Sequence, residues 1–343
     1  MFARSFELAH NGNRAFSTPS YCAIMNTTLY NALGGEKPVL AELKYVKSSK
    51  DLVTSIDITQ SGFLQQALRK TKEASPYVDH AKRFLNKLQV ARAPKELLGF
   101  PEIRDDLITA AGFSDKATNY FSPSELEEAL LRVLQEIEQR TGSDWRTEII
   151  YRFLLTRGDT LGGVMRNIMG AEAKTKFAEA ILTALRDKGI IPTITSSRRD
   201  TEKVQQVSWP WRVLLFDKKP KIIGKNVDAI LLRRTSELTN VDSDLSITAL
   251  LNNKENYLAC GEVKGGIDPA GADEHWKTAY GALDRIREKF KGKPPKLFFV
   301  GAAIENSMAE EIFSQLQSGL LSHAANLHVP QQLSDLAFWL ISL

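Results

Sequence analysis

The chain has 343 residues, of which 43% are hydrophobic and 25% are charged, and its formal net charge is +4. These values are typical of a folded globular protein of one large domain or two fused units. No apolar run approaches the ~20 residues of a membrane span, and residues 1–10 lack the pattern of a secretory signal. Two distant cysteines form neither a disulfide framework nor a CxxC metal motif, so we expect a reducing cytoplasm.

Positive charge is concentrated in one segment. Residues 198–234 contain ten Lys and Arg residues against four Asp and Glu residues. Such a segment suits a polyanion bound at one face, but a solvated basic loop has the same composition. On charge alone, the loop is the favoured interpretation.

The first part of the chain is predicted to be helical. We expect an N-terminal extension over residues 1–48 and a helical subdomain over residues 49–150. Pro76 is predicted to be the first residue of a helix, and Gly112 and Gly142 are predicted to end helices.

The strongest helix start lies at Ser122. Pro123 follows it, and Glu125 stands three residues on, which is the pattern of a capping box. Apolar residues then recur at helical spacing to Ile137, which predicts an amphipathic helix.

The second part, residues 151–343, changes to an alternation of helices and strands. Three consecutive strands can form an antiparallel meander, and a helix can then cross over to a further strand. The predicted elements are a helix over 161–187, strands over 211–216, 226–232 and 257–264, a helix over 271–290, a strand over 296–300 and a last helix over 308–317.

Three side chains in this part suggest chemistry. Asp228 lies in an otherwise apolar strand, where an unpaired carboxylate would be costly. Glu262 and Lys264 lie at the end of the next strand, two residues apart and therefore on one face. We expect both to face Asp228.

This arrangement suits phosphodiester hydrolysis with Mg²⁺. Asp228 and Glu262 supply hard oxygen ligands, and the main-chain carbonyl of Val263 is a candidate third ligand. Lys264 can orient the attacking water and stabilise the transition state. The alternative is an ordinary Glu–Lys pair at the end of an edge strand.

Longer motifs surround these residues. Residues 261–277 have the sequence GEVKGGIDPAGADEHWK, and the stretches 157–167 (RGDTLGGVMRN) and 299–306 (FVGAAIEN) accompany it. Together they resemble type II restriction endonucleases of the AvaI/BsoBI kind, which are members of the PD-(D/E)XK nuclease superfamily. The resemblance covers about residues 50–343 and implies an α/β core, with a mixed central sheet flanked by helices, behind an N-terminal helical subdomain.

The resemblance also implies an activity. It implies Mg²⁺-dependent cleavage of both strands of duplex DNA by a homodimer at a six-base palindrome, such as CYCGRG. Asp228, Glu262 and Lys264 match the catalytic triad of the family, and His275 matches a histidine near the cleavage centre. Val227 stands where the superfamily motif has proline.

His275 has two interpretations. An imidazole exchanges protons near neutral pH, so it can serve as a proton donor or acceptor beside the scissile phosphate. It can equally be a helix histidine that contacts phosphate or packs beside Trp276.

Five residues are candidates for DNA contact. Asp268 can accept a hydrogen bond from cytosine, or it can cap the helix that begins at Pro269. Arg166 and Asn167 follow a Gly-Gly pair in a segment predicted to open a helix, whose glycines can instead serve tight packing. Lys225 is a candidate for phosphate contact, and Lys277 is a further candidate for DNA contact.

The resemblance therefore implies a type II restriction endonuclease, with a cognate DNA methyltransferase as its expected functional partner. One alternative is a structure-selective repair or recombination nuclease with the same core. Another is a DNA-binding module without activity, against which the intact triad argues.

Overall fold

The computed structural model describes residues 43–197, 203–234 and 244–343. Most of the predicted N-terminal extension and the beginning of the basic segment therefore lie outside the described residues. The helices are α2 (Ile56–Leu88), α3 (Arg104–Ala110), α4 (Asp115–Thr118), α5 (Pro123–Thr141), α6 (Trp145–Asp187), α7 (Asp244–Leu251), α8 (Ala272–Lys289), α9 (Asn306–Gln317) and α10 (Pro330–Ser342). The strands are β1 (Thr193–Ser196), β2 (Val204–Trp209), β3 (Arg212–Lys218), β4 (Val227–Arg233), β5 (Tyr257–Lys264), β6 (Lys296–Gly301) and β7 (His323–Asn326).

One mixed sheet organises the second half of the described chain. Its seven strands are neighbours in chain order. Strands β1 to β5 are antiparallel, whereas β5, β6 and β7 are parallel. The predicted meander and the crossover by α8 are confirmed. Strands β1, β2 and β7 and helix α10 had not been predicted.

Each face of the sheet is covered by helices. In β4, Ile230 and Leu232 pack against the side that carries α8 and α9, and Ala229 and Leu231 pack against the side that carries α6 and α10. Because both faces are buried, the central strands β3, β4 and β6 contain continuous apolar runs. The predicted α/β core with flanking helices is confirmed.

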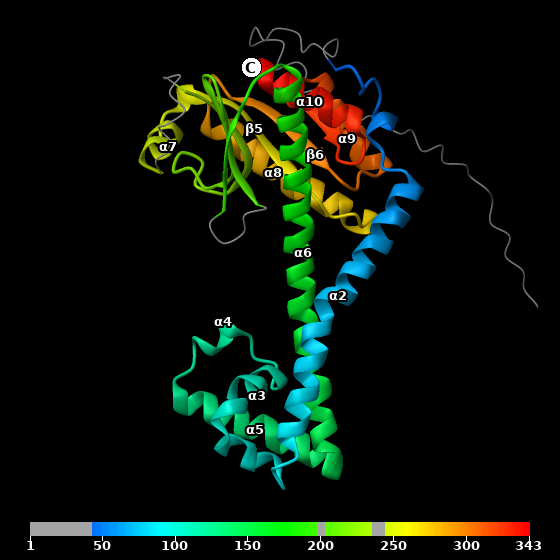
Figure 1. The fold of residues 1–343 in the computed structure, drawn as a ribbon, viewed down its shortest axis with the longest axis vertical. Coiled ribbons are helices and arrows are strands. Elements are labelled where there is room, and N and C mark those ends of the chain that lie inside the picture. The colour runs from blue at the N-terminus through cyan, green and yellow to red at the C-terminus, as the bar shows by residue number, and fades with distance from the viewer. Residues whose placement is uncertain (1–42, 198–202, 235–243) are drawn as a thin grey trace, which may run out of the picture.

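A separate group of helices lies away from the sheet (Figure 1). Its core is formed by the end of α2, by α3 and α5, and by the beginning of α6, with Phe84, Ile137 and Phe153 buried in it. The predicted capping box at the start of α5 is present, since Glu125 N–H donates to Ser122 Oγ at 3.3 Å and Ser122 N–H donates to the Glu125 carboxylate at 2.7 Å. Gly112 and Gly142 follow helix ends with positive φ angles of 86° and 56°, as predicted.

Helix α6 joins this group to the sheet (Figure 1). It runs without a break from Trp145 to Asp187, so residue 150 lies inside one helix that both parts share. Leu43 and Val46, at the end of the predicted extension, are buried in the core beside α8 and α9. The proposed division of the chain into domains stays a prediction.

Two helix boundaries were predicted wrongly. The glycines at 158, 162 and 163 suggested a helix start, but they lie inside α6. A glycine inside a helix costs about 1 kcal/mol, which packing at both ends of this long helix outweighs. Pro76 lies inside α2 rather than at a helix start. It lies on an exposed face, where the strain of its ring can be relieved toward solvent.

Within the described ranges, no helix has the length and apolar character needed to cross a membrane.

Candidate active site

Asp228, Glu262 and Lys264 meet where β4 begins and β5 ends. Lys264 Nζ lies 2.9 Å from Glu262 Oε2 and 3.7 Å from Asp228 Oδ2. The last residue pair between the two strands is Ala229 with Gly261. Beyond it, Val263 N–H donates to Asp228 Oδ2 at 3.0 Å, so the Asp228 side chain continues the connection between the strands. The predicted juxtaposition is confirmed, and the catalytic roles stay a prediction.

The charge of Asp228 opposes the ionisation of Glu262. Burial and the nearby charge of Asp228 raise the pKa of Glu262 to about 7, although Lys264 acts in the opposite direction. Only 6% of the Glu262 side chain is exposed. A cation bound between the carboxylates would relieve their repulsion.

The chemistry of these donors fits a hard divalent cation. Among the described residues there is no group of three or more His, Cys, Asp and Glu side chains able to hold a metal. Two carboxylates are nevertheless sufficient for Mg²⁺, which binds through one or two of them together with water and substrate phosphate. The Val263 carbonyl lies past the last paired residues of β4 and β5, so it is a candidate for a further ligand.

Sequence reasoning missed two charged residues at this site. Lys174, from α6, bonds to Asp217 and lies 2.9 Å from Asp228 Oδ1. Asp217 precedes the last residue of β3 and also pairs with Lys203 at 3.0 Å. Burial raises the pKa of Asp217, but its bonds to Lys174 and Lys203 prevail, so the net shift is downward. Burial lowers the pKa of Lys174, but the attraction of Asp228 and Asp217 prevails, so the net shift is upward.

A glycine allows α6 to come this close. A Cβ on Gly265 would lie 2.3 Å from the Met169 carbonyl oxygen and 2.7 Å from Ala173 Cβ. The backbone directly after β5 therefore touches the backbone of α6. Lys174 follows Ala173 in the chain, so this contact brings it to the carboxylates.

His275 lies in the first turn of α8, as predicted. Its side chain is exposed, and a Cβ on Gly266 would lie 3.0 Å from His275 Nε2. The imidazole thus lies over the glycine turn that follows Lys264, where it can be reached from solvent.

The other DNA-contact candidates differ in their surroundings. Asp268 Oδ1 accepts from Ala270 N–H at 3.0 Å and caps the short 3₁₀ helix at Pro269–Gly271, which is the capping alternative. Lys277 is exposed but pairs with Asp273 at 2.6 Å. Arg166 and Asn167 are exposed in the middle of α6, so the argument from a helix start does not apply to them.

Lys225 is exposed in the turn between β3 and β4. Lys219 and Lys221 are exposed in the same turn, which leads directly to Asp228. This part of the basic segment therefore lies beside the triad.

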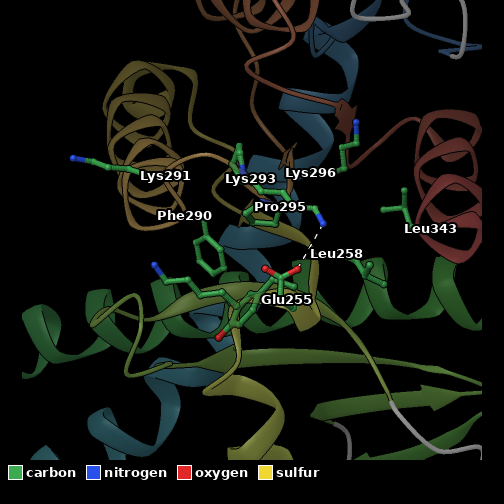
Figure 2. Close-up of a pocket in the computed structure, with 11 residues that line it drawn as sticks. Glu255, Leu258, Phe290, Lys291, Lys293, Pro295, Lys296 and Leu343 are labelled. Carbon is green, nitrogen blue, oxygen red and sulfur yellow. Dashed lines mark ion pairs between the residues drawn. The ribbon is translucent and has the colours of Figure 1, made fainter. Parts of the chain in front are cut away.

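A pocket of about 280 Å³ lies elsewhere, at the start of β5 (Figure 2). Tyr257, Leu258 and Phe290 contribute to its lining, and at its edge Lys293 pairs with Glu255 at 3.6 Å. The triad lies at the other end of the same strand, so this pocket is not part of the candidate active site.

The sheet topology and this site together define a class of protein. An antiparallel meander that continues through a crossover helix into parallel strands, with Asp on one strand and Glu-x-Lys on the next, is the arrangement expected of PD-(D/E)XK nucleases. Residues 43–343 match the family described as "Restriction endonuclease BsobI". The chain belongs to this family.

Curated relatives agree with the family match. The chain is 39% identical over 320 residues to "Type II restriction enzyme BsoBI" of Geobacillus stearothermophilus, which covers 87% of this chain and 97% of that protein. It is also 39% identical over 318 residues to "Type II restriction enzyme AvaI" of Nostoc sp. and of Anabaena variabilis, covering 87% of this chain and 98% of each relative.

Proposed function

We propose that this protein is a type II restriction endonuclease that hydrolyses phosphodiester bonds in duplex DNA at a specific sequence. The observation that carries the proposal is the meeting of Asp228, Glu262 and Lys264 at one end of the sheet. Membership of the family and the names of the relatives support it independently.

Type II restriction endonucleases generally need a divalent metal ion, and for this enzyme we propose Mg²⁺. Asp228, Glu262 and the Val263 carbonyl would hold it. Bound there, it would lower the pKa of a water ligand and offset charge that develops on the phosphate.

The neighbouring side chains have distinct proposed tasks. Lys264 is anchored by Glu262 and would hold the attacking water and stabilise the negative charge of the transition state. His275 is exposed beside the glycine turn and would exchange a proton near the scissile phosphate.

The substrate also implies an assembly. A palindromic duplex has two scissile phosphates related by a two-fold axis, which a C2 homodimer matches. Lys219, Lys221 and Lys225 of each chain would contact the DNA phosphates beside its active site. We further propose a bacterial cytoplasmic location and a cognate DNA methyltransferase that protects the same sequence.

Digestion of a long plasmid tests the proposal. A restriction endonuclease produces discrete fragments whose ends map to one short sequence, with CYCGRG as the first candidate. A preference for forks or flaps over plain duplex would instead favour a structure-selective nuclease.

Two variants test the site. Glu262→Ala and Lys264→Ala should lower the cleavage rate by about 10²–10³-fold, because each removes a group aimed at the transition state. Both should still bind the duplex in a gel-shift assay. Lys291→Ala, which changes an exposed lysine beside the pocket at the other end of β5, is the matched control and should cleave normally. Cleavage by Lys264→Ala at the rate of this control would refute the assignment.

A further inference from the structure

The residues around the triad form a row of alternating charge. Asp228 contacts lysines through both of its oxygens, with Lys174 Nζ 2.9 Å from Oδ1 and Lys264 Nζ 3.7 Å from Oδ2. The row continues at both ends and contains, in order, Lys203, Asp217, Lys174, Asp228, Lys264 and Glu262. It therefore contains three acidic and three basic side chains in alternation.

The fold holds the Lys174 side chain in one position. The contact of Gly265 with the α6 backbone sets where the lysine stem begins, and Asp217 accepts a hydrogen bond from its ammonium group. Only 18% of the Lys174 side chain is exposed. Asp217 itself has a positive φ of 53°, a conformation that few residues other than glycine adopt and that marks a constrained position.

We propose that Lys174 is a positioning residue that acts through Asp228. Its ammonium group holds Oδ1, which fixes the carboxylate so that Oδ2 is presented toward Glu262. The same positive charge lowers the affinity of the site for a divalent cation, because like charges repel at short range. This inference rests on the proposed function, in which Asp228 and Glu262 hold the metal.

The proposal predicts two effects of opposite sign. Lys174→Met keeps the length and apolar stem of the side chain but removes its charge. Metal binding should become tighter by about tenfold, since a nearby charge shifts a partly buried site by about one pKa unit or more. The kcat should fall by about tenfold or more, because Asp228 loses a charged hydrogen bond, while KM for DNA should change by less than about twofold.

Direct binding of Mn²⁺ to the full chain without DNA, followed by the electron paramagnetic resonance of the free ion, measures the first effect. Steady-state cleavage of a plasmid with one site measures the second. Lys176→Met is the matched control, since it changes an exposed lysine of the same helix, and it should leave both quantities unchanged. Lys174→Arg keeps the charge and should bring Mn²⁺ affinity back to within about twofold of the original chain.

A double variant covers the case in which Lys174→Met does not fold. Lys174→Met with Asp217→Asn removes one charge of each sign, so the net charge of the row is unchanged. It should fold, bind Mn²⁺ more tightly and have a lower kcat. Mn²⁺ affinity that does not rise in either variant, or a kcat that stays at the level of Lys176→Met, would overturn the proposal. Glu262→Gln separates the two proposals: if it binds Mn²⁺ and cleaves like the original chain, the proposed assignment of Asp228 and Glu262 as metal ligands fails, whatever Lys174 does.

Discussion

The Glu262 carboxylate is buried, and the nearby Lys264 does not fully offset the cost of its negative charge. Its pKa is raised to about 7 from an ordinary value of 4.5, first by burial and then by Asp228. Between these two pH values the folded protein binds more protons than the unfolded chain, so its stability falls as the pH rises. Ionised Glu262 destabilises the folded protein. This effect is absent below about pH 4.5, where the carboxyl is protonated in both states, and complete above about pH 7.

Glu262→Gln should remove this dependence. Because the amide is neutral at every pH, the metal-free variant should unfold at a higher temperature than the metal-free original chain at pH 8.5. This difference in unfolding temperature should be smaller at pH 5. Thermal unfolding at both pH values measures the difference. Glu179→Gln, at an exposed position of α6, is the control. A gap that is equal at both pH values would contradict the explanation.

The triad could be predicted from the sequence because its signal is local. Glu262 and Lys264 share one strand, and Asp228 interrupts an apolar run in the strand before. Lys174 and Asp217 gave no such signal. Lys174 is brought to the site by the packing of α6 on Gly265, and Asp217 by its pairing with Lys174 and Lys203 from other elements. Both are properties of the tertiary structure.

At the scale of elements, two glycines of the helical part differ in the backbone conformation that their positions require. A Cβ on either Gly158 or Gly142 would meet no atom within 4 Å, so only the backbone distinguishes them. Gly158 lies inside α6, whereas Gly142 ends α5 with a φ of 56°.

Gly158→Ala should therefore stabilise the protein by up to about 1 kcal/mol, because alanine is the better helix former. Gly142→Ala should destabilise it by about 1–2 kcal/mol, because a side chain disfavours positive φ. Thermal unfolding of both variants measures the two shifts. Shifts of the same sign would show that backbone conformation does not control these positions.

Strand β7 was missed by sequence analysis because its local pattern is weak. It has four residues, two of them alanines, and it depends on pairing with β6. The capping box of α5 was found because its signal lies within four residues. The start of α6 was missed because three glycines obscured a helix that tertiary packing maintains.

At the scale of the whole molecule, the homodimer is open to direct test. Sedimentation of the protein with a short duplex that carries the mapped palindrome should give a complex with two chains per duplex, since each strand needs its own triad. The same duplex with a scrambled centre is the control. A complex that contains one chain at saturating protein would count against the two-fold arrangement.

The length of helix α6 affects how the two parts of the molecule are oriented. It begins in the core of the helical group at Trp145, passes the charge row at Lys174 and ends in the core beside the sheet. Its 43 residues correspond to a rod about 64 Å long. One residue inserted into its middle would turn one end relative to the other by about 100° and lengthen the rod by about 1.5 Å. The number of residues between the two cores therefore sets the relative orientation of both parts of the enzyme, and single insertions or deletions there would misalign them.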